Sequence, residues 1–302
     1  MQVFFRVLAL GALVTVAGAA SAQADDEGRS DSPPHEEQGG AERELNNHRF
    51  VIPAEIDNAF MVSSLAFDQG FGVATLQSAE VDAKLFLLRE RFRVQVGIAN
   101  VVALEASADA SAGVAGNFET LLNQAAAANL EFATGPKVRL FTLKEAGVQV
   151  STGLYYRTTL DYTVSPSAAL ASGNTSQLLT KNRSAYIDPA LMVAWGGGAL
   201  GLQLEVRPSI TTNRLNAPSE LQAGAAIGLD LNRPTKGVVP FALTVEYNLQ
   251  KTLDGADPEH YLTSGVFYSA KRDLQLGLRY SKVIGMPGEK LQFGTLNLGY
   301  FF

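Results

Sequence analysis

The segment LQFGTLNLGYFF, Leu291 to Phe302, carries an apolar or aromatic residue at every second position from Leu296 to its end. The alternating row consists of Leu296, Leu298, Tyr300 and Phe302. Between them lie polar or small residues, among them Thr295, Asn297 and Gly299. Because successive side chains of a β-strand point to opposite faces, this period of two predicts a strand with one apolar face.

A last strand of this kind, ending in an aromatic residue, resembles that of bacterial outer-membrane β-barrel proteins. The resemblance covers residues 58–302 at the level of the porin-like class, and no family-specific functional motif accompanies it. It implies a barrel embedded in outer-membrane lipids. It also implies that Leu296, Leu298, Tyr300 and Phe302 form the signal read by the barrel-assembly machinery.

The first residues predict export. Met1 to Arg6 has one positive charge, Val7 to Ala20 is apolar or small, and Ala20-Ser21-Ala22 offers a cleavage site for a signal peptide. The apolar run is about 14 residues, too short for the roughly 20 of a spanning helix. We therefore expect residues 1–22 to be removed after Ala22, and the mature chain to reach the outer membrane. The chain has no cysteine, which excludes a lipid anchor on cysteine and disulfide chemistry.

Residues 23–57 form a separate region before the barrel, and most of its charge is acidic. Residues 25–44 hold eight acids and two bases, whereas the remaining body is near neutral, so nothing points to a nucleic-acid partner. This composition favours a solvated, disordered tail. A segment that enters the barrel lumen or contacts a periplasmic partner is the alternative.

From Asn58 onward the chain alternates repeatedly, most clearly from Val238 to Gln250. Counted back from Phe302, the connections alternate between long and short, as in transmembrane barrels. The count gives an all-β, antiparallel up-and-down barrel of twelve strands, with ten as the alternative. It places the first strand at Ala59–Phe67, an outer loop at Asp68–Glu80, a tight turn at Glu90–Arg91 and a very long loop at Glu105–Leu130.

Charged residues on the inward parity are the candidate functional residues. These residues are Arg93, Arg139, Arg157, Glu205, Arg207, Glu246 and Arg279. Buried charges must be hydrated or paired, which leaves two interpretations. The first is an open or gated pore for small polar solutes, favoured because many inward positions are small. The second is a structural or surface-binding barrel that does not transport, its lumen closed by arginine–glutamate pairs.

Other features are less specific. Asn117 to Asn129 predicts a short helix in an outer loop, with Asn117 as its N-cap. Gly196, Gly198 and Gly201 fit a dinucleotide-binding spacing, but a strand follows them, so they predict a tight turn. His260, near Asp254, Asp257 and Ser264, leaves a rim hydrolase as a further alternative. No catalytic residue, metal site or cofactor is expected.

Overall fold

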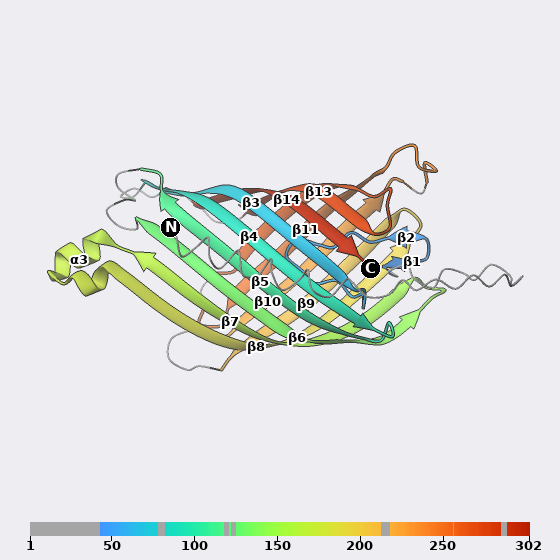
Figure 1. Cartoon of the computed structure of the whole chain (residues 1–302), viewed down its shortest axis with the longest axis horizontal. Coiled ribbons are helices and arrows are strands. Elements are labelled where there is room, and N and C mark those ends of the chain that lie inside the picture. Colours follow the sequence, from blue (N-terminus) through green and yellow to red (C-terminus); the bar gives the residue numbers. More distant parts are fainter. Residues whose placement is uncertain are drawn as a thin grey trace, which may run out of the picture. The chain divides into compact units, whose positions relative to one another are not determined.

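The structure, a computed structural model, describes one compact unit within Gly39–Phe302. The described residues are 43–77, 82–117, 121, 125–212, 218–232, 234–255, 257–284 and 289–302. Within them, twelve antiparallel strands close into a barrel (Figure 1). The predicted fold class and strand number are therefore confirmed. The expected signal peptide and residues 23–42 lie outside the described part of the chain.

The barrel follows the order of the sequence, each strand pairing with the next. Its strands are β3 (Ser64–Gln77), β4 (Asp82–Ile98), β5 (Val102–Ala115), β6 (Ala126–Leu143), β7 (Val148–Val164), β8 (Leu179–Gly197), β9 (Leu200–Thr211), β10 (Glu220–Asp230), β11 (Phe241–Thr252), β12 (Glu259–Tyr268), β13 (Leu274–Ile284) and β14 (Glu289–Phe301). Pairing of β14 with β3, from Glu289–Leu76 to Phe301–Ser64, closes the barrel. Closure leaves no strand edge unpaired.

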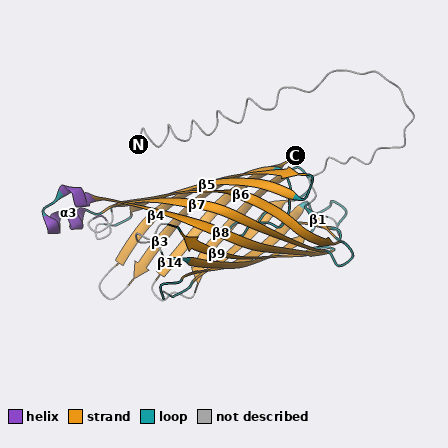
Figure 2. Ribbon diagram, turned by 90° about the horizontal axis from the view of Figure 1, so that it is seen from below, coloured by secondary structure: helices purple, strands orange, loops and turns teal. Residues whose placement is uncertain are grey.

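The two ends of the barrel differ. At one end, which we call the short-turn end, β4 and β5 are joined through Ala99 and Asn100, both with positive φ, as in a tight hairpin turn. At the other, the long-loop end, the connection between β7 and β8 contains α3 (Pro166–Ser172) and η1 (Thr175–Leu178) (Figure 2). Phe301 lies at the short-turn end, beside Ser64. The alternation of short and long connections is what the sequence predicts.

Several predicted boundaries are wrong. β3 begins at Ser64 and continues to Gln77, through the loop expected at Asp68–Glu80. Glu90 and Arg91 lie inside β4 instead of in a turn, since Arg91 faces the lumen and pairs with a carboxylate there. The alternation is interrupted in β4, because Leu87 lines the lumen together with the arginines and Glu90 lies on the outward row between Arg89 and Arg91.

The long loop expected at Glu105–Leu130 contains most of β5 and the start of β6. Its Ala-, Ser- and Gly-rich sequence hides the strand period. Of the helix predicted at Asn117–Asn129, residues 118–120 and 122–124 lie outside the described part of the chain. Leu121 is helical and donates its N–H to the carbonyl oxygen of Asn117 at 3.0 Å, but Ala126–Asn129 belong to β6, so the helix does not reach its predicted end. A further short helix, α3, lies in the connection between β7 and β8.

Large apolar side chains cover the outer face of the barrel. Leu278 is 66 % exposed, and the row Leu296, Leu298, Tyr300 and Phe302 is 47–57 % exposed. The outward direction of this row, predicted from parity, is therefore correct. No helix in the described residues is long and apolar enough to cross a bilayer.

A charged side chain on this outer face should destabilise the barrel more, the deeper it lies in the bilayer. Leu278 lies in the middle of β13, whereas Leu200 begins β9 at the short-turn end. In lipid bilayers, we expect Leu278→Arg to lower the free energy of unfolding by about 2–4 kcal/mol, and Leu200→Arg by about 0–1 kcal/mol. Urea titration in phospholipid vesicles measures both. Equal losses would contradict a lipid-facing row at Leu278.

Candidate functional site: an occupied lumen

The segment Arg43–Ser63 lies inside the barrel, and we call it the plug. It begins with a two-stranded hairpin, β1 (Glu44–Leu45) and β2 (His48–Arg49), at the short-turn end (Figure 1). Its apolar side chains Phe50, Ile52 and Phe60 are 2–7 % exposed and pack in one cluster with wall residues. From residue 43 onward the tail expected to be solvated is thus mostly buried, while Asn46 and Asn47 in the hairpin turn are exposed. Residues 59–63, predicted to start the first strand, are part of the plug.

The plug backbone is irregular, so it needs hydrogen-bond partners other than a sheet ladder. Glu246 of β11 supplies three: its carboxylate accepts the successive N–H groups of Ala54, Glu55 and Ile56 at 2.7–2.8 Å. Consecutive N–H groups converging on one anion are a favourable binding arrangement. A wall carboxylate therefore fixes the centre of the plug.

Neutral amides of the wall also bind the plug backbone. Gln95 donates to the carbonyl oxygens of Phe60 and Val62 at 2.7 and 2.8 Å. Gln275 accepts from the N–H of Ile52 at 2.9 Å and donates to its carbonyl at 3.4 Å. Three further wall glutamines donate to plug carbonyls: Gln149, Gln203 and Gln222. The predicted list of lumen residues contained charged groups alone, so sequence analysis missed these glutamines.

Glycines form a recess in the wall where the plug lies. A Cβ at Gly97 would come within 2.0 Å of the Met61 carbonyl oxygen, and one at Gly224 within 2.2 Å of Ile56. At Gly201 a Cβ would meet the His48 ring at 2.2 Å. The small inward residues predicted to leave space do so, but at these positions the plug occupies the space.

Ion pairs join the plug to β4 and β9. Glu55 pairs with Arg89 at 3.2 Å and with Arg91 at 3.3 Å. Asp57 pairs with Arg207, which also binds Glu205 on its own strand. Burial raises the pKa of the Asp57 carboxyl, but the cations facing it, Arg207 foremost, outweigh burial and hold this pKa below its ordinary value. The Asp57 carboxylate is thus charged at neutral pH.

Arg157 of β7 links strands above the plug. Its guanidinium binds Asp188 at 2.8 Å, Glu220 at 3.0 Å and Glu131 at 3.2 Å, one carboxylate from each of three other strands. Asp109 of β5 binds both Arg89 and Arg91 at 2.7–2.8 Å. Charged groups on this side of the lumen therefore hold one another.

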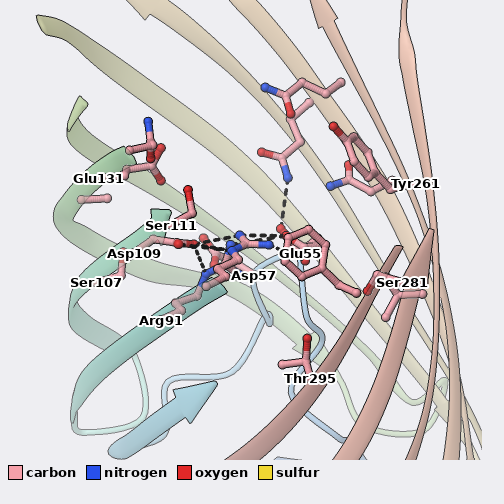
Figure 3. A pocket seen from close by; sticks show the side chains of 18 of the residues that line it. Glu55, Asp57, Arg91, Ser107, Asp109, Ser111, Glu131, Tyr261, Ser281 and Thr295 are labelled. Carbon is pink, nitrogen blue, oxygen red and sulfur yellow. Dashed lines mark hydrogen bonds and ion pairs between the residues drawn. The ribbon is translucent and has the colours of Figure 1, made fainter. Parts of the chain in front are cut away.

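Above the plug, toward the long-loop end, the lumen opens into a cavity of about 520 Å³, which we call the vestibule. Its floor includes Glu55 and Asp57 of the plug (Figure 3). Asp109 and Glu131 lie on one side of it, and Tyr261 and Ser281 on the other (Figure 3). Within the plug, the residues that line the vestibule are Glu55 and Asp57, so this cavity ends at the plug.

The structure places the predicted lumen residues as follows. Arg157 and Arg207 line the vestibule, while Glu205 and Glu246 bind plug N–H groups beneath it. Of the predicted arginine–glutamate pairs, Arg207 and Glu205 are in contact.

Arg93 and Arg279 both bind Asp68, and each donates to a plug carbonyl. Arg139 lies opposite Ser151, beside a register shift in β6. The prediction missed Arg89, Arg91 and Asp109. Arg91 fell in a predicted turn, Arg89 directly before that turn and Asp109 in a predicted loop, whereas one continuous β4 and a longer β5 place all three on the inward face.

The hydrolase alternative finds no support in the geometry. His260 lies on the outer face, where its Nδ1 is 2.6 Å from the Tyr247 hydroxyl. Ser264 is four residues further along the same strand, about 13 Å at 3.3 Å per residue.

Gly198 has a φ of 62° in the tight β8–β9 turn, as predicted. No cluster of metal-ligating side chains occurs among the residues described.

No protein-family model and no curated protein sequence matches the chain. Solved structures do match. An outer membrane channel from Pseudomonas putida F1 is 11 % identical with a TM-score of 0.52, covering 84 % of this chain and all of that one. The translocator domain of the autotransporter NalP from Neisseria meningitidis is 11 % identical with a TM-score of 0.50, covering 80 % and 88 %. At this identity the likeness is one of fold, that of outer-membrane β-barrels.

A methyl group in the glycine recess should loosen the plug. Since the chain has no cysteine, Ala59→Cys gives a unique thiol at a side chain that is 1 % exposed. We expect Gly97→Ala to speed maleimide labelling of this thiol by about tenfold or more, because overpacking costs about 1–3 kcal/mol.

Gly228→Ala is the matched control, since its Cβ would lie at an ordinary 3.6 Å from His48. Equal labelling rates in the two backgrounds would mean that the recess does not hold the plug.

Proposed function

We propose that this outer-membrane β-barrel is a gated channel for small polar solutes, and that the plug is its gate. In this proposal the chain is exported by its signal peptide and inserted through its terminal aromatic row, with the short-turn end facing the periplasm. The observation that carries the proposal is a polar vestibule of solute size that ends on a segment outside the sheet. Removal of that segment would open the lumen without breaking any strand pair.

The contacts of the plug are of a kind that water can replace. Its backbone is bound by side chains such as Gln95, Gln275 and Glu246. A hydrogen bond of this type contributes about 0.5–1.5 kcal/mol net, because water competes for both partners. In an open lumen the same wall groups would be hydrated. Displacement of the plug therefore exchanges partners and leaves no buried polar group unsatisfied.

A barrel that does not transport is the second candidate. Its supporting observation is the apolar cluster that includes Phe50, Phe60 and Phe301, which resembles a permanent core more than a sliding contact. Arg43, 5 % exposed, further secures the hairpin by donating to the carbonyl oxygen of Arg272. Measurement of current distinguishes the two functions.

Weakening the central anchor should open the channel. Glu246→Gln replaces a carboxylate that holds three plug N–H groups, and hydrogen bonds to a charged group contribute about 1.5–3 kcal/mol each. In planar bilayers we expect wild-type protein to be closed most of the time, and this variant to be open about tenfold more often.

Glu220→Gln is the control, because Glu220 binds Arg157 in the vestibule and not the plug. If neither wild-type protein nor the Glu246 variant carried current over a range of salts and voltages, the gated channel would be wrong and the closed barrel would stand.

A further inference from the structure

The vestibule has two unlike walls. On the side of β4 to β7 it is lined by charged groups, including Arg89, Arg91 and Asp109. On the side of β11 to β14 the lining is neutral except for Lys282. The neutral wall comprises the amides Asn248 and Gln250, the hydroxyl groups of Thr263, Ser281 and Thr295, and the rings of Tyr261 and Phe293. Figure 3 shows Tyr261, Ser281 and Thr295 on this side, across the cavity from Asp109 and Glu131.

The charged wall is already neutralised internally. Arg89 and Arg91 bind Asp109 and Glu55, and Arg157 binds three carboxylates. A charged solute would have to displace one partner of such a pair and leave the other without its counter-charge. A neutral solute can bind beside these pairs and leave them intact. The charge arrangement therefore disfavours ions and tolerates neutral molecules.

The neutral wall offers an unused hydrogen-bond acceptor. Asn248 is 5 % exposed, and its Oδ1 is buried with no hydrogen-bond partner among the described residues. A buried amide oxygen without a donor is unfavourable. Asn248 is one of the residues that line the vestibule, so a solute hydroxyl that reaches this amide would relieve it. Nearby, the hydroxyl groups of Thr263 and Ser281 are 2.8 Å apart and retain acceptor capacity for a solute.

We propose that the vestibule binds a neutral, hydroxyl-rich solute of sugar or polyol type, with hydroxyl groups donating to Asn248 and to the Thr263–Ser281 pair. Tyr261 and Phe293 supply the apolar surfaces that the C–H faces of a sugar ring cover. The cavity of about 520 Å³ lies within the range of small-molecule sites and holds one or two sugar rings. This inference names the solute class of the proposed channel and rests on that function, but binding itself needs no open gate.

The test compares glucose, glucuronate and glucosamine, which share one ring size and differ in charge. Saturation-transfer NMR titration of the detergent-solubilised full chain measures each Kd. We expect glucose to bind, and both charged sugars to bind about tenfold more weakly or not at all. Failure of glucose to bind, or tighter binding of either charged sugar, would overturn the inference.

Variants locate the site. Asn248→Leu removes the acceptor at similar volume and should raise the Kd for glucose about fivefold. Gln250→Leu, on the same wall, should act in the same direction and serves if the first variant does not fold. Gln292→Leu, on the outer face at the same end, should leave the Kd unchanged. Unchanged affinity in both wall variants would exclude this site.

The two proposals fail separately. If glucose binds but the Glu246 variant carries no current, the proposed binding site stands and the proposed channel is wrong. If that variant carries current but glucose does not bind, the proposed gate stands and the proposed solute class is wrong.

Discussion

A backbone outside the sheet, enclosed in a barrel, must find a hydrogen-bond partner for every buried N–H and C=O group. This requirement explains the lumen of the protein better than the charges do. The described plug forms no strand ladder with the barrel. The barrel backbone donates to it at Asn46 and at Ser63. Wall side chains that reach inward bind its backbone, among them the glutamines, Glu246 and basic residues such as Arg93. A glutamine suits this role because one neutral group donates to a carbonyl and accepts from an N–H.

The packing of the wall and the placement of its charges also match the plug. Glycines such as Gly97 and Gly201 lie where the plug approaches the wall most closely. Carboxylates of the plug complete the pairing of Arg89, Arg91 and Arg207. Ion pairs of this kind are weak evidence for stability, but each buried charge would be costly if its partner left. The lumen is consequently specified as a unit, with wall and plug satisfying each other.

The sequence predicts the barrel well because the outer face has a strong physical signal. Lipid-facing rows such as Leu274–Tyr280 and Leu296–Phe302 alternate clearly, and twelve strands follow from them. The prediction weakens in β3 to β6, where Ala, Ser, Gly and charged residues interrupt the apolar row. There Glu90–Arg91 resembles a turn, although the surrounding barrel holds it in a strand.

The site was less predictable than the fold. The alternation of side chains along each strand predicts that Arg157, Arg207 and Glu246 face the lumen, because the inward direction of a side chain depends on local strand geometry. It does not find their partners, since Arg207 binds Asp57 across 150 positions of sequence. Nor does composition reveal that an acid-rich leader becomes buried from Arg43 onward. Its apolar residues, Phe50, Ile52, Ile56 and Phe60, are the signal that a solvated tail would not carry.

The plug joins the wall at Ser64, and Ser64 belongs to the strand that seals the barrel against β14. The first barrel strand, β3, can pair with β14 only after the whole chain is present. Closure is therefore the most non-local step of folding. Until then the recess for the plug is incomplete, because Gly97 and Gly201 belong to strands on different sides of the open sheet. Plug docking and sheet closure are accordingly coupled events, and a chain that seals without its plug would be a distinct, hollow product of assembly.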